Sequence, residues 1–153
     1  MRNITELNIN EGGRPPSRPP ATDEIIREFE VKLEVSLPED FKTLLRSVNG
    51  GHPQLDSIGG ANAQFAVNRF YHLTNDDYGT ESLWYAAEHW RPILGRKAVP
   101  FANDGGGNQF FLDTADSPAS VKICLHDTNM KIQPIAVSFE SFIDRLEIDP
   151  DMI

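Results

Sequence analysis

The chain contains 153 residues, of which 39% are hydrophobic, and its nine Phe, three Tyr and two Trp indicate a folded core. This length fits one domain and is too short for two. The formal net charge of −9 argues against nucleic acid as a partner, because affinity for phosphates depends on clustered Lys and Arg. An acidic surface suits a basic protein as partner, and it also suits plain solubility.

Cysteine content and hydropathy predict the cellular location. The one cysteine, Cys124, excludes an internal disulfide. Neither a secretory h-region at the N-terminus nor an apolar run long enough to span a bilayer is found in the sequence. We therefore expect a cytoplasmic protein that does not bind membranes.

The N-terminal part of the chain predicts an arm followed by two helices. Residues 1–20 include Gly12-Gly13 and two Pro-Pro pairs, which is typical of a flexible or extended arm preceding one domain over 21–153. Thr22 is suited to cap a helix over 23–34. Pro38 is suited to the first turn of a second helix, which Asn49-Gly50-Gly51 ends.

The central part predicts a strand, a turn and a helix after a loop at 52–62. Uneven alternation with four large apolar residues favours a strand over 64–73. Residues 74–79, Thr-Asn-Asp-Asp-Tyr-Gly, form a turn cluster. The apolar spacing after it predicts a helix over 81–90, closed by Arg91-Pro92.

Residues 99–113 predict a β-hairpin. The alternating apolar residues are Val99 and Phe101 before the turn, and Phe110 and Leu112 after it. Residues 103–108, Asn-Asp-Gly-Gly-Gly-Asn, reverse a chain at little steric cost. A phosphate-binding loop is the alternative. The absence of a Gly-Lys-Ser/Thr or Gly-x-Gly-x-x-Gly pattern, with a strand following instead of a helix, favours the plain turn.

Two more strands and a helix complete the pattern, over 120–126, 132–137 and 139–148, with Ser138 as the helix cap. Helices at both ends with strands clustered between them predict an α+β fold, with a central antiparallel sheet flanked by about four helices.

The residues that commonly carry chemistry form no catalytic pattern. The four histidines, His52, His72, His89 and His126, fall in four different predicted elements without zinc-ligand spacing, so we expect no metal and no cofactor. Cys124 lies in an apolar alternating strand, where a buried thiol is commoner than a nucleophile. No acid/base pair stands out among the carboxylates, which favours solvated charges over catalysis.

One group of residues is typical of a protein interface, because Tyr and Trp beside charges often anchor such contacts. The candidates for binding a partner are Asp76, Asp77, Tyr78, Trp84, Tyr85, Trp90 and Asp104. The alternative is that Trp84 belongs to the core and Trp90 covers the helix end.

Three segments occur in a recognisable order. They are Ile26-x-x-Phe-Glu30-x-x-Leu33 with Leu37-Pro-Glu-Asp-Phe41 and Asn49-Gly50-Gly51; Val99-Pro-Phe-Ala-x-Asp-Gly-Gly-Gly-Asn108 with Phe111 and Asp113; and Ser138-Phe139-x-x-Phe142-Ile143. In these motifs the chain resembles the SUKH superfamily, α+β domains that include bacterial immunity proteins and relatives of a fungal cell-wall assembly regulator. Two positions depart from the family pattern: Glu34 replaces a usual Gly, and Asn108 replaces a common Asp.

The resemblance implies an immunity protein that binds a cognate toxin domain and blocks it without catalysis. The acidic charge suits a basic nuclease as that toxin. A general protein- or ligand-binding regulatory module is the alternative, and an enzyme ranks last.

Structural roles are expected for the motif residues Leu37, Pro38, Asn49, Gly50, Gly51, Pro100, Phe101, Gly105, Gly106, Gly107, Asn108 and Asp113. In the hairpin turn, we expect Val in place of Gly106 or Gly107 to unfold the protein before it abolishes binding.

Overall fold

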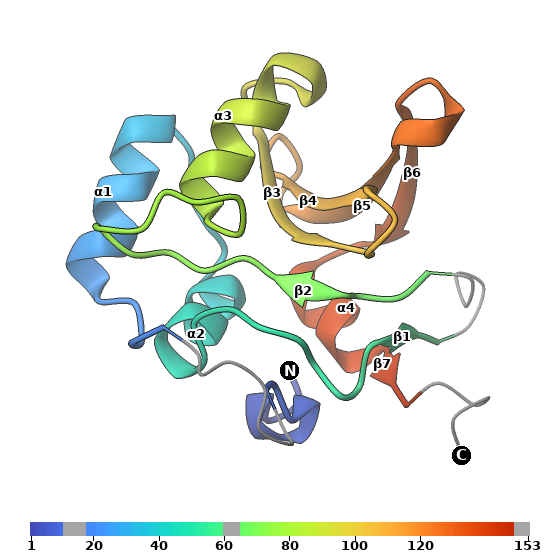
Figure 1. Cartoon of the computed structure of the whole chain (residues 1–153), viewed down its shortest axis with the longest axis horizontal. Helices are drawn as coiled ribbons and strands as arrows, with labels where there is room; N and C mark the ends of the chain where they lie inside the picture. Colours follow the sequence, from blue (N-terminus) through green and yellow to red (C-terminus); the bar gives the residue numbers. More distant parts are fainter. Residues whose placement is uncertain (11–17, 60–64, 149–153) are drawn as a thin grey trace.

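The computed structural model describes residues 1–10, 18–59 and 65–148, which form helices around a five-stranded antiparallel sheet and a separate two-stranded sheet (Figure 1). The helices are α1 (Asp23–Leu33), α2 (Glu39–Ser47), α3 (Leu83–Leu94) and α4 (Phe139–Asp144), with 3-10 turns η1 (Ile4–Leu7) and η3 (His126–Thr128). The strands are β1 (Ser57–Ile58), β2 (Arg69–Phe70), β3 (Ala98–Asn103), β4 (Gln109–Asp113), β5 (Ser120–Leu125), β6 (Lys131–Ala136) and β7 (Leu146–Glu147). The expected α+β class is confirmed.

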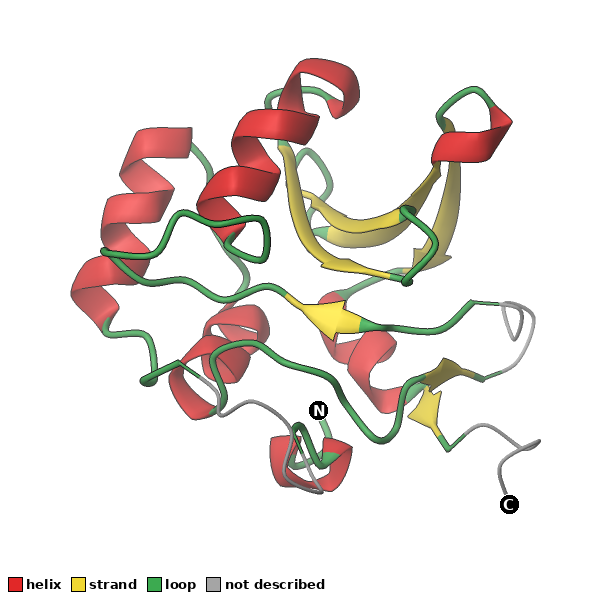
Figure 2. Ribbon diagram, in the orientation of Figure 1, coloured by secondary structure: helices red, strands yellow, loops and turns green. Residues whose placement is uncertain are grey.

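The larger sheet has the strand order β2-β3-β4-β5-β6, and β1 pairs with β7. The expected hairpin is present as β3 and β4, with Val99 opposite Leu112. A bulge between Pro100 and Ala102 interrupts its register, at a proline that has no N–H to donate to a ladder. Figure 2 shows that the sheet is strongly curved, with α4 beneath its convex face and α3 beside β3.

Phe101 lies at the centre of the core. Its side chain is fully buried, and aromatic rings from α2, α4, β2 and β4 surround it. The rings of Phe139 and Phe142, both from α4, each lie 5.4 Å from it in edge contacts. This cluster joins the hairpin to the last helix, so the second and third sequence motifs meet in one place.

The connection between α1 and α2 is held by side-chain hydrogen bonds to the backbone. The Thr22 hydroxyl accepts from the N–H of Ile25 at 3.2 Å, as the expected cap does. Glu30 accepts from the N–H of Leu37 at 2.8 Å. Glu34 follows α1 with φ of 57°, a left-handed conformation that explains why glycine is usual at this position.

The first ten residues differ from the flexible arm expected over 1–20. Ile4 and Leu7 in η1 are buried in the main core. The Arg2 side chain donates to the carbonyl of Ile143 at 3.3 Å, which fastens this segment near α4. Residues 11–17 of the expected arm lie outside the described residues.

The strand expected over 64–73 was predicted too long. Gln64 lies outside the described residues, and β2 has only two residues. The backbone N–H groups around it bond in two directions. Those of Asn68 and Tyr71 bond to Asn103 and Phe101 of β3, whereas those of Val67 and Phe70 bond to Asp56 and Gly51 in the loop before it. The pairing with β3 is therefore short, and the uneven apolar alternation does not mark a long strand.

Two helix ends were also predicted wrongly. Helix α3 continues through Pro92 to Leu94, because a proline in the last turn removes one hydrogen bond and the N–H of Gly95 still bonds to the Arg91 carbonyl. Helix α4 ends at Asp144 instead of residue 148, because the following residues pair with β1, where Leu146 faces Ile58. None of the described helices is long and apolar enough to cross a membrane.

Candidate functional site

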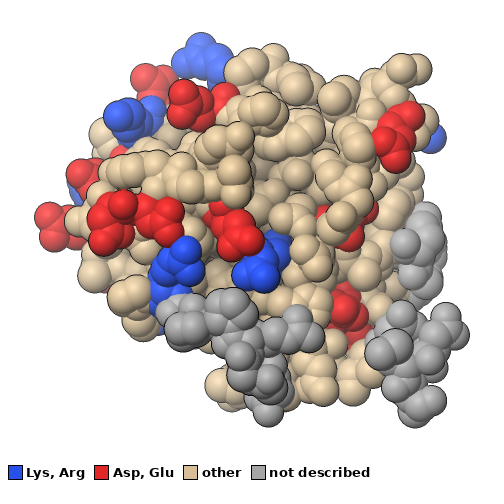
Figure 3. All heavy atoms as spheres, viewed as in Figure 1, with Lys and Arg blue, Asp and Glu red and all other residues tan. Residues whose placement is uncertain are grey.

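The segment between β2 and α3 carries an acidic loop, defined here as residues 74–81. It contains Asp76, Asp77 and Glu81 and no Lys or Arg. Acidic side chains gather on this face along the acidic loop and beside α1 (Figure 3). Arg69 pairs with Glu81 at 3.3 Å, whereas exposed Asp76 forms no hydrogen bond or ion pair with another described residue.

Short polar side chains set the shape of the acidic loop locally. The Thr74 hydroxyl accepts from the N–H of Asp77 at 3.1 Å, and the Asp77 carboxylate accepts from the N–H of Gly79 at 3.0 Å. The Gly79 carbonyl then accepts from the N–H of Ser82, the residue that caps α3. The turn formed by these residues therefore leads directly to the N-terminus of α3.

Trp84 fastens the acidic loop to the core. Its indole N–H donates to the Thr74 carbonyl at 2.9 Å, and its ring meets Phe29 of α1 edge to face at 4.9 Å. Tyr78 lies 6.1 Å from the same indole ring, and its hydroxyl donates to the Asn75 carbonyl. The Tyr78 side chain is nevertheless 58% exposed, so a large aromatic surface is presented to solvent in a fixed orientation.

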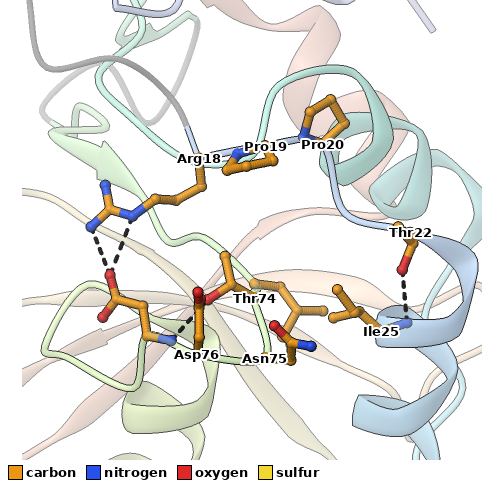
Figure 4. Close-up of a pocket in the computed structure, with 10 residues that line it drawn as sticks. Arg18, Pro19, Pro20, Thr22, Ile25, Thr74, Asn75 and Asp76 are labelled. Carbon is orange, nitrogen blue, oxygen red and sulfur yellow. Dashed lines mark hydrogen bonds and ion pairs between the residues drawn. The ribbon is translucent and has the colours of Figure 1, made fainter.

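A cleft of about 540 Å³ lies between the acidic loop and the segment that leads into α1 (Figure 4). One wall is formed by Arg18, Pro19, Pro20, Thr22 and Ile25, and the other by residues 73–77. Across one end, Arg18 donates to a single carboxylate oxygen of Asp77, from Nη2 at 2.8 Å and from Nε at 3.2 Å. This hydrogen bond, with that from Gly79, lowers the pKa of Asp77 below its ordinary value.

Asn49 joins the two walls of this cleft through hydrogen bonds to the backbone of each. Its side-chain Nδ2 donates to the carbonyls of Pro19 and Leu73 at 2.9 and 2.7 Å, and its Oδ1 accepts from the N–H of Leu73 at 2.8 Å. The following Gly50 has φ of +90°, and an added Cβ there would lie 2.8 Å from the Cβ of His72. The Asn-Gly-Gly motif thus allows a close approach between the end of α2 and the start of the acidic loop.

His72 is the buried titratable group at this site. Its Nε2 lies 3.5 Å from the Asp77 carboxylate, and its Nδ1 is buried without a hydrogen-bond partner among the described residues. Burial, together with the nearby positive charge of Arg18, outweighs the attraction of Asp77 and lowers the pKa of His72. The imidazole is therefore neutral in the folded protein around pH 7.

We expect the stability of the protein to fall on mild acidification because of His72. In the unfolded chain a histidine has a pKa of about 6.5. Below that pH the unfolded state binds a proton at His72, whereas the folded state does not bind it until the pH reaches the lower folded pKa. The free energy of unfolding should therefore decrease as pH falls from about 6.5 towards the lower folded pKa, and His72→Phe should reduce this decrease. Urea unfolding across this range measures it, with exposed His89→Phe as the matched variant. An NMR titration in which the His72 ring is protonated at or above its ordinary pKa would contradict the assignment.

The structure brings together some of the residues expected to bind a partner and separates others. Tyr85 lies one turn along α3 from the acidic loop, 40% exposed and stacked on His89. Trp90 instead packs against a second cluster on the opposite face of the sheet, formed by Ala98, Phe111 and Cys124. Burial raises the pKa of the Cys124 thiol, which disfavours the reactive thiolate.

Asp104 lies in the β3–β4 turn, away from the acidic loop in sequence, and bonds within that turn. Its carboxylate accepts from the N–H groups of Gly106 and Asn108 at 2.9 and 3.0 Å, and from the Asn108 side chain at 2.7 Å. Lys122 of β5 pairs with Asp113 at the end of β4, with 2.6 Å between Nζ and the carboxylate. Burial is the largest single influence on the pKa of Asp113 and would raise it, but the hydrogen bonds from Lys122 and from the N–H of Ala115, together with the charge of Lys122, outweigh burial and hold the pKa below its ordinary value.

Sequence reasoning missed the wall of the cleft that precedes α1. Arg18 was assigned to an arm, although the Pro19-Pro20 pair next to the Thr22 cap restricts the backbone and gave a signal for an ordered approach to the helix. No cluster of metal-ligating side chains occurs in residues 1–10, 18–59 and 65–148.

The fold and the site define a small α+β protein with an open cleft beside an acidic loop. A sequence model of the SMI1 / KNR4 family (SUKH-1) matches residues 20–145, most of the chain, and the chain belongs to this family. The resemblance found in the motifs is thereby confirmed. A search of curated proteins gave no match.

Proposed function

We propose that this chain is a toxin-neutralising immunity protein, which binds a cognate toxin domain through the acidic loop and the aromatic side chains beside it, and blocks that domain without catalysis. Membership of the SMI1 / KNR4 family (SUKH-1) supports a role in binding another protein. The observation that carries the proposal is the fixed presentation of Tyr78, 58% exposed, between two carboxylates and the Trp84 anchor.

The rigidity of this surface favours binding, because side chains already fixed in the free protein lose little conformational entropy in a complex. Hydrogen bonds within the acidic loop and the bond from Trp84 to Thr74 supply that rigidity. The carboxylates add long-range attraction for a basic partner. If the toxin is a nuclease, Asp76 and Asp77 would occupy positions that nucleic-acid phosphates otherwise take.

The test is co-expression with the toxin domain encoded beside this gene. We expect cells to survive only when both are produced, a 1:1 complex on gel filtration, and an affinity that weakens as salt rises. An acidic toxin, or binding insensitive to salt, would contradict the electrostatic part of the proposal. A gene without such a neighbour would favour the alternative, a regulatory module that docks a host protein.

We expect Tyr78→Ala to weaken toxin binding by about 10- to 100-fold, or roughly 1.5 to 3 kcal/mol, because truncation of a central exposed tyrosine removes a typical anchor. Isothermal titration calorimetry measures the change. Val137→Ala is the matched control, since Val137 is 77% exposed on the connection between β6 and α4. Equal losses in the two variants would place the interface elsewhere.

A further inference from the structure

We propose that the cleft between residues 18–25 and 73–77 receives an arginine side chain of the partner protein, with Asp76 and Asp77 holding its guanidinium and the apolar walls lying along its methylene groups. This inference rests on the proposed function, since it names the group through which the partner enters the site. Three observations support it: the composition of the walls, the state of the carboxylates, and the position of Arg18.

The walls of the cleft combine an apolar interior with an acidic rim. Ile25, Pro19 and Pro20 supply the accessible apolar surface on the first wall, whereas Leu73 on the second wall is fully buried beneath it. Asp76 and Asp77 lie on the second wall. The close-up shows Asp76 below the Arg18–Pro20 segment (Figure 4). A long side chain with methylene groups and a terminal cation fits this cleft, because its methylene groups can contact the apolar interior while its charged end contacts the acidic rim.

The two carboxylates differ in how far each is already paired in the free protein. Asp76 is exposed and pairs with no described residue, so its charge is available. Asp77 is fixed by the N–H of Gly79 and already binds a guanidinium, that of Arg18, through one oxygen. The free protein therefore demonstrates that the rim accepts the planar donor group of arginine, which can satisfy two acceptors at once.

Arg18 acts in this arrangement as an internal competitor. Its side chain is 40% exposed and that of Asp77 is 35% exposed, so the ion pair is open to solvent and weak enough to exchange. An incoming arginine can take the Asp77 oxygen while Arg18 turns to solvent. Removal of Arg18 should consequently strengthen binding in the cleft, whereas a merely structural ion pair would predict no such gain.

The test uses the whole chain and a small probe in place of the toxin. The probe is N-acetyl-arginine methylamide, followed by ¹H–¹⁵N NMR at low salt, with the citrulline analogue as an uncharged control of the same shape. We expect millimolar binding, roughly the range for so small a ligand, with shifts confined to residues 18–25 and 73–77 and an affinity at least about fivefold above that of the citrulline probe.

Three variants decide the assignment. Asp76→Asn, which leaves the contacts among described residues in place, should weaken binding of the arginine probe about three- to tenfold. Arg18→Ala should strengthen it severalfold, and Asp127→Asn, at an exposed carboxylate in η3, should leave it unchanged. Equal affinity for the two probes, shifts outside the cleft, or weaker binding by Arg18→Ala would overturn the inference.

Since no toxin is present in this experiment, a negative result leaves the proposed function standing. Conversely, probe binding without toxin neutralisation would reject only the function.

Discussion

Asn49→Ala should lower the free energy of unfolding by about 3 to 5 kcal/mol, which is a large fraction of the stability of a domain this size. Asn49 is 1% exposed, and its amide makes three hydrogen bonds to backbone groups of residues distant in sequence. Alanine would leave the N–H and the carbonyl of Leu73 buried without partners, whereas the Pro19 carbonyl lies on an exposed residue that water can reach. An unpaired buried group costs about 1 to 3 kcal/mol, and the loss of two sets this estimate.

Urea unfolding followed by tryptophan fluorescence measures this change, and Asn75→Ala is the matched control. Asn75 is exposed, and its one hydrogen bond to a described residue uses the backbone carbonyl, so its truncation should change stability by less than about 0.5 kcal/mol. The amide of Leu73 should also exchange faster with solvent in the Asn49 variant. A loss below about 1 kcal/mol would mean that the walls of the cleft are held by something other than Asn49.

Gly107→Val should lower the free energy of unfolding by about 3 kcal/mol, and Gly106→Val by less than about 1 kcal/mol. Gly107 has φ of +95°, a conformation that strains a β-branched residue, and an added Cβ would lie 2.7 Å from Nε2 of His126. The imidazole would have to move, which would break its hydrogen bond to the Gly106 carbonyl.

At Gly106 the added Cβ would meet only a carboxylate oxygen of Asp104, at 3.5 Å, which is ordinary contact. The expectation from sequence that valine at either glycine unfolds the protein therefore needs correction for Gly106. Thermal unfolding of the pair measures the difference. Similar losses for both variants would show that the turn depends on glycine in general and not on the approach of His126.

Local signals predicted the elements whose causes lie within a few residues. The cap at Thr22, the Pro38 start of α2 and the alternation in β3 and β4 each specify structure through neighbours along the chain. The same applies to the turn expected over 74–79, where the Thr74 and Asp77 side chains bond to backbone N–H groups two or three residues further on.

The missed features all depend on partners far away in the sequence. Residues 145–148 continue a helical pattern, yet Leu146 pairs with Ile58 because the earlier segment offers an open strand edge. Trp90 and Trp84 occupy one helix at similar exposure, yet they pack on different clusters because α3 passes the edge of a curved sheet. No periodicity within α3 could assign each tryptophan to its cluster.

By itself, the sequence determined the α+β class, the central hairpin, the family and the acidic segment at 74–81, because composition and short-range spacing encode these directly. Only the tertiary structure decided that Arg18 faces Asp77, that Asn49 fastens both walls, and that a cleft exists there at all. The physical reason is that the cleft arises where two segments about fifty residues apart in the sequence are held side by side. The side chain that holds them is the buried amide of Asn49, and in the sequence Asn49 is part of an Asn-Gly-Gly motif that indicates only the end of a helix.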